Sequence, residues 1–115
     1  MFNPKDIPIF VKNMKNVDPV PMCEGITRRT LSTGKRLMFC LFEWQANAIL
    51  PEHSHHHEQV GYVVSGKVEF TIGGRTVLLG PGESYAIPAN IVHSGKSHEP
   101  TRVLDAFSPI REEYL

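Results

Sequence analysis

Residues 51–62 read Pro51-Glu52-His53-Ser54-His55-His56-His57-Glu58-Gln59-Val60-Gly61-Tyr62, and this stretch decides the fold and the chemistry of the chain. All six histidines lie between His53 and His98, and four of them occupy five consecutive positions. In an extended chain, His53, His55, His57 and Gln59 project from one face. Imidazoles two residues apart on a strand can converge on one metal ion. A solvated polar loop is the alternative, but the strand patterns on either side and the distant His93 favour metal binding.

The segments around this stretch predict short strands. Val68, Phe70 and Ile72 alternate with polar residues, which is typical of a half-buried strand. Gly73-Gly74 predicts a two-residue hairpin into 75–79. The apolar segment 37–44 predicts a strand that is covered on both faces. No window longer than about ten residues has a helical period, except a single turn within 109–115. We therefore predict an all-β sandwich or barrel over residues 26–115.

Residues 1–25 predict an irregular N-terminal arm, with at most one short strand, that lies across the main body. They are rich in Pro, Asn and Lys, and only Ile7, Ile9, Phe10 and Val11 offer apolar surface. The arm is too short to form a second domain.

The composition excludes several classes of protein. The chain has 115 residues, with 12 Lys+Arg against 12 Asp+Glu, so it lacks the basic surface of a nucleic-acid binder. No apolar run approaches the roughly 20 residues that span a bilayer. The N-terminus lacks a secretory pattern, and two cysteines are too few for a disulfide scaffold. We expect a cytoplasmic domain with no nucleic-acid or membrane partner.

Two motifs resemble those of the cupin family. His53-x-His55-x3-Gln59-x6-Gly66 resembles the first cupin motif with Gln in the Glu position, and Gly82-x5-Pro88-x-Asn90-x2-His93 resembles the second. Asn47 and Asn90 stand where the family has Gly, and both tolerate a left-handed backbone. Ser97 replaces the final Asn of the second motif. The resemblance implies a single-domain jelly-roll barrel, also called a double-stranded β-helix.

The cupin resemblance also implies a metal site. Its ligands would be His53, His55, Gln59 and His93, holding one divalent transition metal ion such as Zn, Ni, Fe or Mn. His57 has the same parity and is the rival ligand to His55 or Gln59, whereas His56 and His98 are expected at the surface. A neutral Gln in place of Glu leaves the ion at full charge, which favours Lewis-acid chemistry over dioxygenase chemistry.

Asp105 is the second feature that needs an explanation. It shares one face of a predicted terminal strand with Val103 and Phe107, and a buried carboxylate is costly unless it is paired or hydrogen-bonded. Either it faces outward or bonds Arg102 or Arg111 to hold the tail, or it is catalytic.

The histidine stretch and the terminal Leu-Asp-x-Phe-Ser-Pro-x-Arg-Glu-x-Tyr together resemble the KdgF-type cupins of pectin and alginate breakdown, over roughly residues 25–115. This resemblance implies an enzyme that converts 4,5-unsaturated monouronates into linear ketonised sugars, so the expected partner is a small anionic sugar. It implies that Asp105 is the general acid/base, that Arg111 holds the substrate carboxylate, and that Phe107 shapes the pocket and excludes water.

Three alternatives share the two cupin motifs: a dioxygenase, another sugar isomerase, and a non-catalytic ligand-binding sensor. The pairing of Asp105 with Arg111 separates the uronate enzyme from them. The apolar segment 37–44, which includes Phe39, favours a homodimer, as is common among cupins. Four further residues could line the pocket, but sequence parity does not place them, and they are assigned to the core or the surface by default: Tyr62, Tyr85, Gln45 and Arg29.

Overall fold

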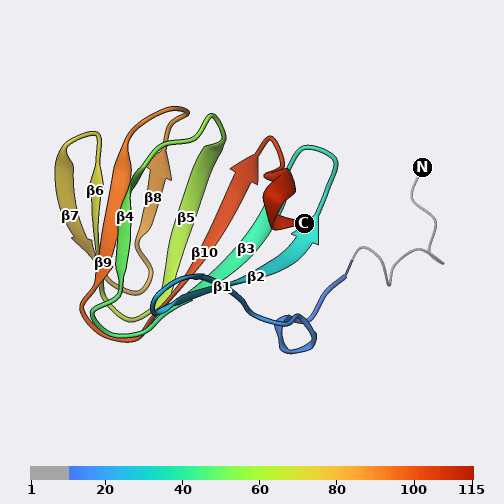
Figure 1. Ribbon diagram of the computed structural model, residues 1–115, viewed down its shortest axis with the longest axis horizontal. Coiled ribbons are helices and arrows are strands. Elements are labelled where there is room, and N and C mark those ends of the chain that lie inside the picture. Colours follow the sequence, from blue (N-terminus) through green and yellow to red (C-terminus); the bar gives the residue numbers. More distant parts are fainter. Residues whose placement is uncertain (1–10) are drawn as a thin grey trace.

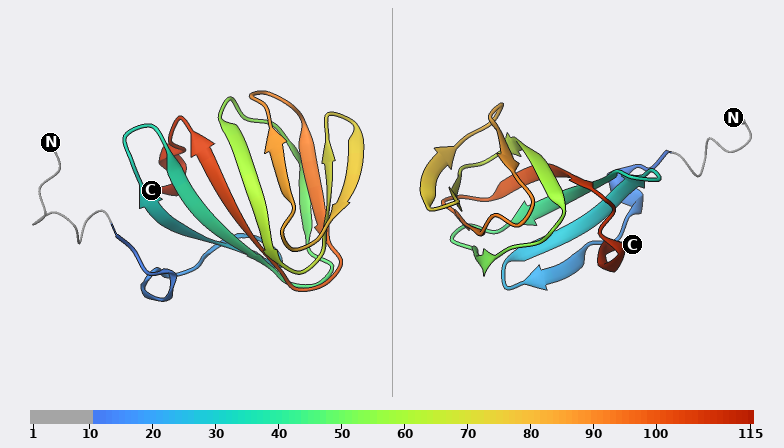
Figure 2. Two further views of the ribbon diagram at one scale, coloured as in Figure 1. Left: turned by 180° about the vertical axis from the view of Figure 1, so that it is seen from behind. Right: turned by 90° about the horizontal axis from the view of Figure 1, so that it is seen from above.

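A computed structural model describes residues 11–115 as two antiparallel sheets that face each other (Figures 1 and 2). The larger sheet has the order β1 (Val20–Cys23), β2 (Ile26–Thr33), β3 (Met38–Trp44), β10 (Thr101–Ser108), β5 (Glu58–Ser65) and β8 (Ser84–Ile87). The smaller sheet has the order β4 (Ile49–His53), β9 (His93–Ser97), β6 (Val68–Ile72) and β7 (Arg75–Leu79). Two 3-10 turns, η2 (Met14–Asn16) and η3 (Glu112–Tyr114), are the only helical segments among the described residues. The prediction of an all-β jelly roll is confirmed.

The hydrophobic core lies between the two sheets. Val63 and Val103 of the larger sheet and Val68 and Phe70 of the smaller one are almost fully buried and belong to one cluster. Each such side chain stabilises the fold by about 1.5–3 kcal/mol through burial alone. The alternation predicted for residues 68–72 is therefore the pattern of a strand with one face on this core.

The turns adopt the backbone that their residues predict. Gly73 and Gly74 join β6 to β7 with φ values of 57° and 83°, and Ile72 pairs with Arg75 across the turn, as the two-residue hairpin requires. Asn47 and Asn90 stand where the cupin motifs have Gly. Their φ values are 61° and 65°, so both residues lie in the left-handed region of backbone conformation. Asn tolerates this region better than other side chains because its amide can hydrogen-bond locally.

The prediction that segment 37–44 is covered on both faces is wrong. Met38, Cys40 and Trp44 of β3 point into the molecule, but Phe39 is 42% exposed on the outer surface of the larger sheet. On the same outer face Leu41 is buried, so β3 is exposed at Phe39 and covered at Leu41. A sequence pattern does not distinguish an exposed apolar side chain from a buried one.

The N-terminal arm is described only in part. Residues 1–10, with Ile7, Ile9 and Phe10, lie outside the described residues, and Val11 is exposed. Arg29 Nε donates a hydrogen bond to the carbonyl of Val17 at 3.0 Å. β1 lies within the predicted arm and pairs with β2 at the edge of the larger sheet. No described helix has the length and apolar character needed to cross a membrane.

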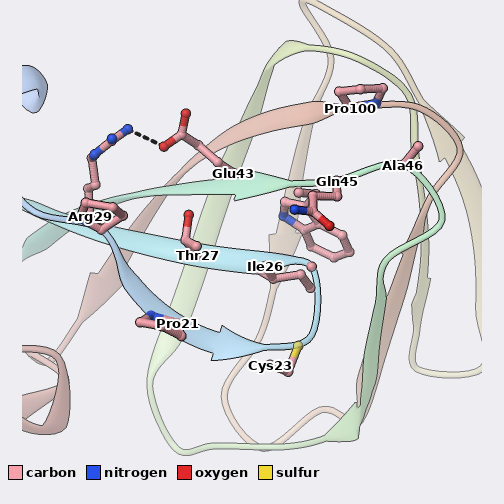
Figure 3. Close-up of a pocket in the computed structure, with 12 residues that line it drawn as sticks. Pro21, Cys23, Ile26, Thr27, Arg29, Glu43, Gln45, Ala46 and Pro100 are labelled. Atoms are coloured by element: carbon pink, nitrogen blue, oxygen red, sulfur yellow. Dashed lines mark hydrogen bonds and ion pairs between the residues drawn. The ribbon is translucent and has the colours of Figure 1, made fainter.

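A hollow of about 560 Å³ lies where β1 and β2 meet the end of β3 (Figure 3). Arg29 and Glu43 form an ion pair at its edge, and Gln45 and Pro100 line it. The residues around it include no histidine and none of the predicted catalytic residues. Arg29 and Gln45 therefore lie at a partly open surface away from the histidine cluster.

Candidate metal centre and acid–base site

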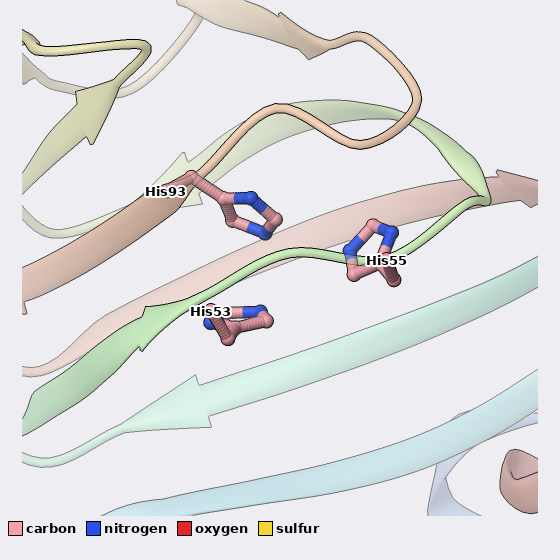
Figure 4. Close-up of side chains that lie close together, drawn as sticks. All are labelled: His53, His55 and His93. Atoms are coloured by element: carbon pink, nitrogen blue, oxygen red, sulfur yellow. The ribbon is translucent and has the colours of Figure 1, made fainter.

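Three histidines from separate segments meet at one end of the smaller sheet (Figure 4). His53 ends β4 and His93 begins β9, and the two residues are direct cross-strand partners. His55 lies in the loop that carries the chain from β4 to β5 in the other sheet. One nitrogen from each ring lies within 4.8 Å of the others, so the three imidazoles can hold one metal ion.

Backbone hydrogen bonds set the tautomer of each of these histidines. His53 Nδ1 lies 2.8 Å from the carbonyl of Pro51, His55 Nδ1 lies 2.9 Å from that of His57, and His93 Nδ1 lies 2.8 Å from that of Ile91. A carbonyl can only accept a hydrogen bond, so each Nδ1 donates. Every Nε2 then carries a free lone pair, which is the arrangement that metal-binding histidines need.

The environment of the cluster also favours the neutral form of His55 and His93. Burial, followed by the nearby guanidinium of Arg111, lowers the pKa of His55 to about 4. Burial lowers the pKa of His93 as well. A neutral imidazole is the form that binds a metal ion.

Gln59 adds a fourth group to the cluster. It is buried near the start of β5, and its Oε1 lies 3.1 Å from His55 Nε2. Because the opposite end of its amide hydrogen-bonds the Asp105 carboxylate, the Gln59 carbonyl is the end that faces His55. Two lone pairs then point at the same space without a proton between them, and a bound cation resolves that repulsion. The donor set thus fits a divalent transition metal ion.

His57 differs from the simple alternation that the sequence predicts. The chain leaves the smaller sheet after His53 and enters the larger sheet at Glu58, so residues 53–59 do not form one strand. His57 is buried near Arg111 and Glu113 of the C-terminal tail, its Nδ1 has no hydrogen-bond partner among the described residues, and it is not among the three clustered histidines. His56 and His98 are exposed, as expected.

Asp105 is buried beside the histidine cluster. It lies on β10 with 3% exposure, and the Tyr85 hydroxyl donates a hydrogen bond to its Oδ1 at 2.6 Å. Burial raises the pKa of Asp105 to about 6, while the hydrogen bonds from Tyr85 and Gln59 and the charge of Arg111 pull it in the opposite direction. A carboxyl group with a pKa near neutrality can both take up and release a proton at physiological pH. The alternative of an outward-facing Asp is wrong.

Phe107 and Arg111 lie close to Asp105 and to the histidine cluster. Asp105, Phe107 and Arg111 line one small cavity of about 50 Å³ together with His53 and Tyr114. The Phe107 ring is almost fully buried, 6.0 Å from the ring of His55. The Arg111 guanidinium lies 5.2 Å from the centre of the Phe107 ring, and its Nε donates a hydrogen bond to Glu113 at 2.8 Å. The structure thus brings the predicted catalytic residues to the edge of the histidine cluster.

Two parts of this site do not follow from the sequence. Tyr85 is among the residues that could line the pocket but that parity does not place, and in the structure its hydroxyl donates a hydrogen bond to Asp105. The sequence predicts no role for Tyr114, yet the guanidinium groups of Arg28 and Arg111 lie 4.2 and 4.1 Å from the centre of its ring. The alternation of Tyr85 with Ile87 could have placed Tyr85 on an inward face, but no local pattern indicates which residue it faces.

Comparisons with known proteins show the family and the fold of this chain. The cupin domain family matches residues 40–107, which is more than half of the chain. This chain belongs to the cupin family. No match was found among curated proteins.

Several solved structures are similar to this chain over nearly its whole length. KdgF from Halomonas sp. is 31% identical, with a TM-score of 0.85 and coverage of 92% of this chain and 97% of that chain. An RmlC-like cupin from Shewanella frigidimarina is 26% identical, with a TM-score of 0.87 and coverage of 91% and 95%. A predicted oxalate decarboxylase from Thermotoga maritima is 14% identical, with a TM-score of 0.75 and coverage of 87% and 98%, and that likeness concerns the fold alone. The similarity to KdgF confirms the resemblance seen in the sequence motifs.

Proposed function

We propose that this protein is a metal-dependent enzyme that opens the ring of 4,5-unsaturated monouronates and yields linear ketonised sugars. The observation that carries the proposal is the cavity where Asp105 and Arg111 lie beside the three-histidine cluster. An acid–base group, a cation for a carboxylate and a metal site are the three elements that this substrate requires. The likeness to KdgF from Halomonas sp. supports the same substrate class.

His53, His55, Gln59 and His93 would hold one divalent transition metal ion. The bound ion would supply Lewis acidity toward substrate oxygens. Arg111 binds the substrate carboxylate through its guanidinium, a pairing that is strong because it is charge-assisted and can be bidentate. Phe107 closes the wall of the cavity against water.

Asp105 carries the proton through the reaction. Its carboxylate takes the proton from the anomeric hydroxyl, the C1 carbonyl forms, and the bond between C1 and the ring oxygen breaks. The electron pair passes to the ring oxygen and leaves an enolate across carbons 4 and 5. Asp105 returns the proton to carbon 4, which gives the C5 ketone, so the reaction is an isomerisation with no net gain or loss of atoms. General acid–base catalysis of this kind contributes about 10²–10⁴-fold to a rate.

The test is a kinetic assay on the purified chain. The substrate is the unsaturated monouronate released by a pectin or alginate lyase, and the signal is the loss of its conjugated absorbance. Metal-loaded protein should accelerate this loss over the spontaneous reaction, and chelator-treated protein should not. Asp105→Asn should keep the metal and lose about 10²-fold or more of kcat.

The assay also separates the alternatives. If the protein binds metal but leaves the uronate unchanged, the proposed function is wrong. Oxygen consumption with candidate substrates would then indicate a dioxygenase, and ligand binding without turnover would indicate a sensor.

A further inference from the structure

Three residues on adjacent strands form one row across the larger sheet. Gly61 of β5 pairs with Tyr85 of β8 on one side and with Asp105 of β10 on the other. The side chains of Tyr85 and Asp105 both point into the molecule, where they are 7% and 3% exposed. They belong to strands that are not neighbours, so any contact between them must pass over β5.

Gly61 makes that contact possible. A Cβ atom at position 61 would lie 2.1 Å from Cζ of Tyr85 and 2.2 Å from Oδ1 of Asp105, far inside van der Waals contact. Because Gly61 has no side chain, the Tyr85 hydroxyl reaches across β5 and donates to Asp105 Oδ1 at 2.6 Å. A short hydrogen bond from a hydroxyl to a carboxylate is among the stronger ones in proteins.

The hydroxyl is held in place by the core around it. The Tyr85 ring packs against Phe70, with ring centroids 4.4 Å apart, and both residues belong to the main hydrophobic cluster. A phenylalanine would fill the same space, so packing alone does not require the oxygen. The oxygen has one described partner, the Asp105 carboxylate.

We propose that Tyr85 is a positioning residue for Asp105, acting through the gap that Gly61 leaves. The Tyr85 hydroxyl holds Oδ1 from the β8 side and Gln59 donates to the same carboxylate, so Asp105 presents one orientation to the cavity that it shares with Phe107 and Arg111. This inference rests on the proposed function, because the orientation matters for proton transfer to a substrate in that cavity.

Tyr85→Phe tests the proposal because it removes only the hydroxyl. We expect kcat for the unsaturated monouronate to fall about 10- to 100-fold, the cost of a misplaced catalytic group, while KM and the bound metal per chain stay near their wild-type values. Val63→Ala is the matched control, since Val63 belongs to the same hydrophobic cluster as Tyr85 but does not line the cavity, and its truncation removes no hydrogen bond. Gly61→Ala should reproduce the loss of kcat; if it does not fold, Tyr85→Phe still decides.

A crystal structure of Tyr85→Phe gives a readout that does not depend on turnover. We expect the Asp105 carboxylate to rotate away from its wild-type orientation. An unchanged orientation with unchanged kcat would overturn the proposal, and so would an equal loss of kcat in Val63→Ala. If the wild-type protein does not turn over the uronate, the proposed function fails, and the orientation of Asp105 in the variant still decides whether Tyr85 sets it.

Discussion

Gln59 uses both ends of its amide, which explains why the cupin motif has Gln at this position in this chain. Its carbonyl faces the histidine cluster and its NH₂ group donates to Asp105. A glutamate could bind a metal, but it has no donor for Asp105 and would place a second negative charge against a buried carboxylate. Like charges at such contact oppose ionisation of both groups.

Gln59→Glu should therefore retain metal and lose activity. We expect a fall in kcat/KM of about tenfold or more, because the variant loses the orientation and charge state of the acid–base group. Bound metal and uronate turnover are the two measurements. Glu58→Gln is the control, because Glu58 is exposed on the opposite face of β5. Wild-type turnover in Gln59→Glu would disprove the two-sided role of the amide.

The buried Asp105 carboxylate lowers the free energy of unfolding at neutral pH. Burial raises its pKa from the ordinary 3.8 to about 6, so the native state binds this proton more tightly than the unfolded chain does. The stabilisation by the protonated carboxyl group is fully present below about pH 4 and is lost as the pH rises through 6. The difference between the two pKa values corresponds to about 3 kcal/mol in the free energy of unfolding.

Asp105→Asn should therefore raise the melting temperature of chelator-treated protein at neutral pH, and the gain should shrink toward about pH 4. Differential scanning calorimetry across this pH range measures the effect. A variant that is less stable than wild type at neutral pH, with the difference vanishing in acid, would show the opposite sign and contradict the prediction.

At the scale of elements, the C-terminal tail closes one end of the molecule. After β10, the tail forms η3, and the carbonyl of Tyr114 accepts a hydrogen bond of 2.6 Å from the Thr30 hydroxyl on β2. Tyr114 packs in one buried cluster with Met38, Cys40 and Phe107. The tail thus brings Arg111 to the cavity and at the same time covers the Cys40 thiol.

The reactivity of the Cys40 thiol reports whether the C-terminal tail stays packed over it. It is fully buried, and burial raises its pKa to about 11, so only roughly one thiol in a thousand is ionised at pH 8. In a Cys23→Ser background, we expect Cys40 to react slowly with a thiol reagent. Tyr114→Ala should increase that rate by about tenfold or more, because it uncovers the thiol.

Leu115→Ala is the control for this experiment, since Leu115 lies beside Tyr114 and is 72% exposed. It should leave Cys40 protected. Rapid labelling of Cys40 in the otherwise unchanged chain would mean that the tail does not cover the thiol in solution.

At the scale of the whole molecule, the outer surface of the larger sheet is apolar over three adjacent strands. Ala106 of β10 pairs with Phe39 of β3 and with Val60 of β5, and Leu104 pairs with Tyr62 in the next row on the same outer face. Phe39, Val60 and Tyr62 are 42%, 50% and 48% exposed. Exposed apolar patches of this kind mark interaction surfaces.

We expect a second copy of this chain to cover that surface, so the protein should have the mass of a homodimer by light scattering after size-exclusion chromatography. Val60→Glu should shift the mass to a monomer, because it would bury a charge in the interface. Val77→Glu is the control, since Val77 is similarly exposed (42%) but lies on β7 of the smaller sheet. A monomeric wild-type protein would contradict the prediction.

The class of fold and the three clustered histidines could be predicted from the sequence, because these depend on local periodicity and on spacing. Alternation in residues 68–72, the Gly73-Gly74 turn and the left-handed Asn47 and Asn90 are properties of short segments, and the structure has all of them. The grouping of His53, His55 and His93 followed from motif spacing in a known family.

Only the tertiary structure decided which distant residues meet. That Tyr85 reaches Asp105 depends on the order β10-β5-β8 and on the missing side chain of Gly61 between them. That His57 faces the tail depends on the change of sheet between His53 and Glu58. Strand order, register and crossings join residues far apart in the chain, and local periodicity carries no information about them, so the partners of a side chain emerge only when the sheets are assembled.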